Sequence, residues 1–144
     1  DLISAETVLL NHPTLNVAKA VRASASIPGI FTPTEIDKQL FVDGAIANHI
    51  PYLKKTDSDV IIACNTISKK PLNKIPDSMY DIIDRSIDCA LLGNLKFSEK
   101  NVDLLIDVVE NPTSSINLNN REKLVNYGFE AIKKNKEKIE MLLK

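Results

Sequence analysis

The residue whose type and setting could do chemistry is Asp43, which follows the apolar pair Phe41 and Val42 and precedes Gly44. An aspartate that leaves a strand and enters a turn can lie at a sheet edge beside a cleft, where open α/β sheets bind ligands. A carboxylate in such a place can act as a general base. An Asp-Gly pair is also a common simple turn, because both residues tolerate turn geometry. The dipeptide alone leaves both interpretations open.

A base needs a group to deprotonate, and the usual nucleophile motif is missing from this sequence. No G-x-S-x-G occurs around its four glycines. Ser24 and Ser26 are the tempting substitutes, but both lie at the predicted end of a helix, where we do not expect a nucleophile. The sequence therefore predicts half of an active site.

The histidines and cysteines add little to this prediction. His49 lies close to Asp43 in the sequence and His12 precedes a proline, and we expect structural hydrogen bonds from both. Cys64 and Cys89 fall in apolar segments and are predicted to be buried free thiols. A disulfide framework or a zinc site would need more ligands at closer spacing. No metal and no cofactor is predicted.

The composition is that of a soluble globular protein, and we expect one domain over residues 1–144. Of these residues, 44% are hydrophobic and 26% charged, and the net charge of −1 lacks the basic excess of a nucleic-acid binder. Lys69, Lys70 and Lys74 cluster in a proline-containing loop, where a solvated loop is favoured over an anion site. No apolar run approaches the roughly 18 residues of a membrane span, and no signal peptide is visible, so we expect a cytoplasmic location.

The apolar pattern predicts strands that alternate with helices, hence an α/β fold with a mostly parallel sheet flanked by helices. The predicted strands are residues 7–10, 39–42, 59–64 and 102–109. The predicted helices are residues 14–27, 78–92 and 120–143, with a short helical turn at 51–55 and a loop at 30–37. The strand at 59–64 is continuously apolar, which predicts burial on both faces.

Each predicted helix has an apolar face and end signals. The inward faces are predicted to be Leu15, Ala18, Val21 and Ala25; Met79, Ile82, Ile83, Ile87 and Leu91; and Leu124, Ile132, Ile139, Leu142 and Leu143. Thr14 or Asn16 is predicted to cap the first helix, Ser78 with Asp81 the second, and Gly93 to end the second.

Several motifs, in order, resemble the patatin-like phospholipase family of bacterial type. Residues 22–31 resemble the family's R-A-S-x-A-x-P-x-x-F segment, with Arg22 first. Residues 40–45 resemble its Asp-Gly-Gly/Ala motif, and residues 48–51 the Asn-x-x-Pro that follows it. The match extends over residues 1–66 and is thinner beyond, where residues 116–131 are similar to the family's closing helix. Residues 3–5 depart from the family's Thr-Gly pair.

The resemblance implies a Ser-Asp dyad that hydrolyses lipid acyl esters, in a three-layer fold of which this chain is the C-terminal part. Asp43 would be the general base, Gly44 and Ala45 would complete its motif, and Gly44 would let the serine approach closely. Phe41, Val42 and Ile46 would supply an apolar setting. Ile27, Ile30 and Phe31 could line the acyl cleft or touch a lipid surface, although core packing is the commoner role for such residues.

The nucleophile elbow and the oxyanion loop lie upstream of this region in the family. A chain that starts at Asp1 without Met is therefore expected to be part of a longer protein and to be inactive without its N-terminal half. The implied partners are a lipid ester, that N-terminal half and, transiently, a membrane surface. The alternatives are a non-catalytic binding or assembly module, a degenerate relative, and an unrelated ligand-binding domain.

Overall fold

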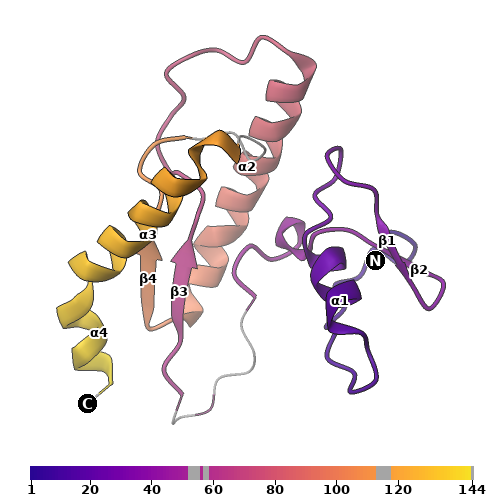
Figure 1. Cartoon of the computed structure of the whole chain (residues 1–144), viewed down its shortest axis with the longest axis horizontal. Coiled ribbons are helices and arrows are strands. Elements are labelled where there is room, and N and C mark those ends of the chain that lie inside the picture. The colour runs from indigo at the N-terminus through magenta and orange to yellow at the C-terminus, as the bar shows by residue number, and fades with distance from the viewer. Residues whose placement is uncertain (52–55, 57–58, 113–117, 144) are drawn as a thin grey trace. The chain divides into compact units, whose positions relative to one another are not determined.

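The computed structural model describes residues 1–51, 56, 59–112 and 118–143, which form two compact units, Asp1–His49 and Ile50–Lys144 (Figure 1). Each unit contains a two-stranded sheet and at least one helix. The predicted α/β class is thus confirmed. The sheet pairing is mixed, because one pair of strands is parallel and the other antiparallel. The helical turn predicted at 51–55 lies, apart from Pro51, outside the described residues.

The first unit is built from helix α1 (Val17–Ser24), the hairpin strands β1 (Thr34–Ile36) and β2 (Gln39–Phe41), and the short 3₁₀ helix η1 (Gly44–Ile46). Asn16 caps α1, since its side chain accepts the backbone N–H of Lys19 at 3.2 Å. The core of the unit contains Ala23, Ile36 and Phe41, with Leu10 and Leu15 packed against it. The predicted α1 face is therefore partly wrong: Ala18, Val21 and Ala25 are exposed.

A tight turn joins the two hairpin strands where a loop was predicted for residues 30–37. Ile36 and Gln39 are paired, so only Asp37 and Lys38 lie between the strands. Both have positive φ, 49° and 67°, as a type I′ turn requires. The loop prediction missed β1 because the usual glycine of such a turn is absent. Pro33 does not prevent the strand, since it precedes the first paired residue.

Residues 7–10 do not form the predicted strand. They belong to no strand in the described part of the chain, and Val8 and Leu9 are exposed. Leu10 alone of this run packs against the core. A β-branched apolar run becomes a strand only when a neighbour accepts its backbone hydrogen bonds.

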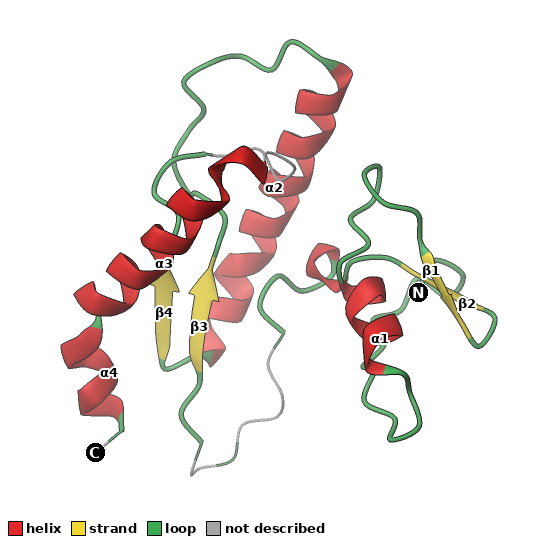
Figure 2. Ribbon diagram, in the orientation of Figure 1, coloured by secondary structure: helices red, strands yellow, loops and turns green. Residues whose placement is uncertain are grey.

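The second unit contains the parallel strands β3 (Ile62–Asn65) and β4 (Leu104–Asp107) and the helices α2 (Met79–Ser98), α3 (Arg121–Lys134) and α4 (Lys136–Leu142) (Figure 2). Two 3₁₀ turns, η2 (Glu99–Asn101) and η3 (Leu118–Asn120), complete it. Its core joins Ile50, Ala63 and Leu95, so α2 covers one face of the strand pair. Side chains of β3 alternate between exposed and buried, which corrects the prediction of burial on both faces. Cys64 lies on the exposed side.

Helix α2 begins as predicted and ends later. The Ser78 hydroxyl oxygen accepts the backbone N–H of Asp81 at 3.0 Å, so the cap is confirmed. Gly93 lies inside the helix, which continues to Ser98 because Leu95 anchors its last turns in the core. Of the residues predicted to face inward, only Leu91 is buried, and Ile87 is half-buried.

The first turns of α2 carry apolar side chains outward. Met79, Ile82 and Ile83 are 74%, 50% and 44% exposed, contrary to prediction, and Cys89 is exposed as well. An apolar period identifies the apolar face of a helix, but it does not say which neighbour covers that face.

The C-terminal helical segment is divided at Asn135. The side-chain amide of Asn135 donates to the carbonyl of Ala131 at 2.9 Å, and the residue ends α3 and starts α4. A single helix over residues 120–143 was predicted. Ile132 and Leu143 of its predicted inward face are exposed, whereas Leu124, Ile139 and Leu142 are half-buried.

A polar network closes the carboxyl end of the parallel strands. Asn65, which is fully buried, donates from its side-chain nitrogen to Asp107 Oδ1 at 2.7 Å and to the carbonyl of Ile67 at 2.8 Å. Its side-chain oxygen accepts the N–H of Ile67 at 3.1 Å. The strand register pairs Asn65 directly with Asp107. These bonds fix how the chain leaves β3.

Replacing Lys38 with glycine should stabilise the first unit. Lys38 adopts a positive φ that is unfavourable for a residue with a Cβ atom, and Lys38→Gly removes that penalty, for an expected gain of about 0.5 kcal/mol or more. The free energy of opening is measured by amide hydrogen exchange of the hairpin. Lys38→Ala is the control, because it shortens the side chain and keeps the Cβ atom. An equal gain from both variants would show that backbone strain is not the cause.

Candidate active site

Asp43 lies between β2 and η1 and is half-buried. Its carboxylate caps η1, because Oδ1 accepts the backbone N–H of Ala45 at 2.9 Å. Its own backbone N–H donates to the carbonyl of Ser26 at 3.0 Å. Two hydrogen bonds therefore fix both the backbone and the side chain of this aspartate.

The cap determines what the carboxylate can do. Oδ1 faces the start of η1, whereas Oδ2 is not used by this cap. Ala45 contributes its backbone N–H, so its part of the motif acts through the main chain. The cap therefore fixes the orientation of the Asp43 carboxylate.

Nothing in the described structure requires glycine at position 44. Gly44 does not have a positive φ, and a Cβ atom added there would meet no heavy atom within 4 Å. The turn itself therefore does not explain the glycine. The surroundings of Gly44 are open, and the residue is exposed to solvent.

The predicted apolar setting of Asp43 is only partly present in its own unit. Phe41 is buried, but it packs into the core with Ala23 and Ile36. Val42 is half-buried and Ile46 is 40% exposed. Within the first unit, these three residues of the predicted setting do not enclose the carboxylate.

The predicted acyl-cleft residues are brought together by a second turn. The carbonyl of Ile27 accepts the N–H groups of Ile30 at 3.1 Å and Phe31 at 2.9 Å. Gly29 has φ 81° and follows Pro28, as in a type II turn. Ile27 and Ile30 are half-buried, and Phe31 is 56% exposed. None of the three is fully buried, so their side chains are available for contact.

The two serines before this turn differ in their surroundings. Ser24 is exposed at the end of α1, whereas Ser26 is 2% exposed. The Ser26 hydroxyl lies 2.8 Å from the carbonyl of Arg22 and 3.0 Å from the Thr34 hydroxyl. A buried hydroxyl whose proton is held by a carbonyl is a poor nucleophile. His12, for its part, is exposed and bonds locally to Thr14 at 2.8 Å.

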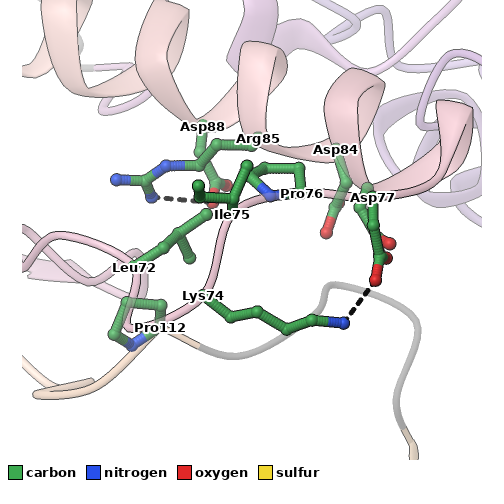
Figure 3. A pocket seen from close by; sticks show the side chains of 10 residues that line it. Leu72, Lys74, Ile75, Pro76, Asp77, Asp84, Arg85, Asp88 and Pro112 are labelled. Carbon is green, nitrogen blue, oxygen red and sulfur yellow. Dashed lines mark hydrogen bonds and ion pairs between the residues drawn. The ribbon is translucent and has the colours of Figure 1, made fainter.

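The second unit has a cavity of about 260 Å³ that sequence reasoning did not find (Figure 3). Its walls are the loop around Ile75, the start of α2, and Pro112. Four carboxylates line it, from Asp77, Asp81, Asp84 and Asp88. Figure 3 shows Lys74 paired with Asp77 and Arg85 with Asp88. The helical spacing of these four aspartates in the sequence is the signal from which this acidic cavity lining could have been predicted.

The lysine cluster predicted as a solvated loop is a set of ion pairs at the surface. Lys69 bonds to Asp107 at 2.9 Å, Lys70 approaches Glu110 at 4.0 Å, and Lys74 bonds to Asp77. Each of the three lysines is paired with one carboxylate, so the cluster has little net positive charge with which to bind an anion. In the described ranges, no group of three or more His, Cys, Asp or Glu could hold a metal ion. No described helix has the length and apolar character needed to cross a bilayer.

Comparison with known proteins gives one family for the region around Asp43. Residues 7–54 match the family model described as patatin-like phospholipase. Uncharacterized NTE family proteins of Mycobacterium bovis and Mycobacterium tuberculosis are each 39% identical to this chain over 64 residues. That match covers 42% of this chain and 11% of each relative, so the chain spans only a small part of their length.

Proposed function

We propose that the protein is a lipid acyl hydrolase in which Asp43 is the general base of a Ser-Asp dyad, because residues 7–54 match the patatin-like phospholipase family model. The serine would come from a segment outside these 144 residues. The observation that carries the proposal is the capped carboxylate of Asp43, held at both backbone and side chain beside the open space at Gly44.

The proposed reaction has two steps. The serine Oγ attacks the ester carbonyl while Asp43 Oδ2 takes up the serine proton, and the alcohol leaves with that proton as the acyl-enzyme forms. Water then attacks the acyl-enzyme, Asp43 takes up its proton, and the fatty acid leaves as the serine regains a proton. The chain supplies the base, whereas the complete protein must supply the serine and the donors that stabilise the oxyanion.

The proposed substrate is a lipid ester, reached through transient contact with a membrane surface, and Ile27, Ile30 and Phe31 are the proposed lining of its acyl site. Their half-buried and exposed side chains support this role, since contact with an acyl chain needs accessible apolar surface. We retain a cytoplasmic location and the N-terminal half of the same protein as proposed location and partner. No cofactor enters the proposed reaction.

A non-catalytic assembly module is the second candidate function. The exposed apolar residues of α2, which include Met79, Ile82 and Phe97, favour it, because a large apolar surface without a cover often marks a contact with another protein segment. Both functions could reside in one protein, so the activity of Asp43 is the property to test.

Replacing Asp43 with asparagine in the complete protein should abolish turnover of a short acyl ester. The asparagine side chain would have the same size and could still accept the N–H of Ala45, but it could not take up the serine proton. The loss of a general base should lower kcat by at least about a hundredfold. Asp37→Asn, in the exposed hairpin turn, is the matched control. Undiminished hydrolysis by Asp43→Asn would reduce Asp43 to a turn residue.

Replacing Gly44 with alanine separates folding from function. The open surroundings and ordinary φ of Gly44 predict unchanged or higher stability, by about 0.4–1 kcal/mol. In the complete protein the added methyl group should obstruct the serine, so hydrolysis should fall while thermal unfolding does not. A variant with full activity would show that no group approaches Asp43 from this side.

The chain of 144 residues should not hydrolyse a short acyl ester by itself, because it lacks a G-x-S-x-G serine. The measurement is release of the alcohol at micromolar chain concentration, against the Asp43→Asn chain as the blank. Turnover by the unaltered chain above that blank would contradict the proposed division of the dyad.

A further inference from the structure

We propose that Ser26 is a positioning residue for Asp43 and that it acts through a buried hydroxyl pair with Thr34. The role in catalysis rests on the proposed function of Asp43. The positional role rests on the contacts around these two hydroxyls, which connect the end of α1, strand β1 and the segment that carries Asp43.

The direction of each hydrogen bond in the pair follows from its partners. The Ser26 hydroxyl lies 2.8 Å from the carbonyl of Arg22, and a carbonyl can only accept, so Ser26 donates its single proton there. The Thr34 hydroxyl, 3.0 Å away, must then donate to Ser26. Both residues are 2% exposed. A buried hydroxyl that loses its partner is costly, so the pair strongly favours one arrangement.

The pair reaches Asp43 along two routes. Directly, the Ser26 carbonyl accepts the backbone N–H of Asp43 at 3.0 Å, while the Ser26 N–H donates to the carbonyl of Ala23 at 3.2 Å. Through the sheet, Thr34 is paired with Phe41, and the chain then runs from Phe41 to Asp43. Asp43 is therefore linked to the same hydroxyl pair from both sides.

This closed connection determines where the carboxylate lies. Proton transfer needs the base within hydrogen-bond reach of the nucleophile, and a displacement of about 1 Å can lower a rate by two orders of magnitude. A shift of Ser26 would move the carbonyl that holds the Asp43 backbone. The hydroxyl pair thus controls the position of the proposed base without touching the substrate.

Conservative variants can test the connection without unfolding the unit. Ser26→Ala removes only the hydroxyl that bonds to Arg22 and Thr34 and leaves the backbone unchanged, so this variant should fold. Thr34→Val keeps the shape of threonine and removes the hydroxyl, whereas Thr34→Ser keeps the hydroxyl. Ser24→Ala is the control, because Ser24 is exposed at the end of the same helix.

The first measurement is hydrogen exchange of the Asp43 amide in the chain, by NMR. Loosening the bond to Ser26 should raise that exchange rate about five- to tenfold in Ser26→Ala. The increase should be smaller in Thr34→Val and absent in Thr34→Ser and Ser24→Ala. The α1 amide of Ala20 is the internal reference. An unchanged Asp43 amide, or one that rises only in step with Ala20, would overturn the positional role.

The second measurement is turnover of a short acyl ester by the complete protein. Ser26→Ala should lower kcat by about 10- to 100-fold with KM within about twofold, and Thr34→Ser should retain activity. If Asp43→Asn abolishes turnover and Ser26→Ala leaves kcat unchanged, the positioning role is wrong and the proposed function stands. If Asp43→Asn leaves turnover intact, the proposed function fails, and the exchange measurement still decides whether the pair holds Asp43.

Discussion

The hydrogen bond from the Asp43 backbone to the Ser26 carbonyl is the interaction on which the candidate site depends. It joins the segment after α1 to the segment after β2, so the aspartate is held by its main chain before its side chain makes any contact. The carboxylate can then cap η1 through Oδ1. A short hairpin and a single helix are sufficient to hold Asp43 in place because this bond connects them.

Local signals in the sequence predicted the start of a helix or the end of a strand where a capping or turn residue lies at that position. Ser78 predicted the start of α2, Asn16 was among the predicted caps of α1, and Asp43 was predicted directly after a strand. These residues act on backbone groups within a few positions, so the sequence contains the whole interaction. The family resemblance, found from the motifs around Asp43, is confirmed over residues 7–54. The roles of the site residues remain predictions.

Features that depend on strand pairing or on packing in the core could not be predicted in the same way. The turn at Asp37 and Lys38 lacks glycine, and only the pairing of β1 with β2 forces its positive φ values. Gly93 was predicted to end a helix, but Leu95 continues it because of its place in a core with Ala63.

Exposure was equally hard to predict, because it depends on which neighbours cover each face. Met79, Cys64 and Cys89 are exposed although each lies in an apolar segment. The hydroxyl pair of Ser26 and Thr34 joins residues from two parts of the chain. The pattern of apolar residues in the sequence gives no indication of this hydrogen bond. Both cases need the tertiary contacts before they can be recognised.

The bond between Asn65 and Asp107 has a consequence for how the second unit reaches its fold. The two residues are 42 positions apart in the chain, so their strands meet only after a long loop has closed, which is an intrinsically slow event. A slip of one residue would turn every side chain of one strand to the opposite face and separate the amide from the carboxylate. The buried Asn65 therefore favours one register of the two strands, because its side chain reaches Asp107 only in that register.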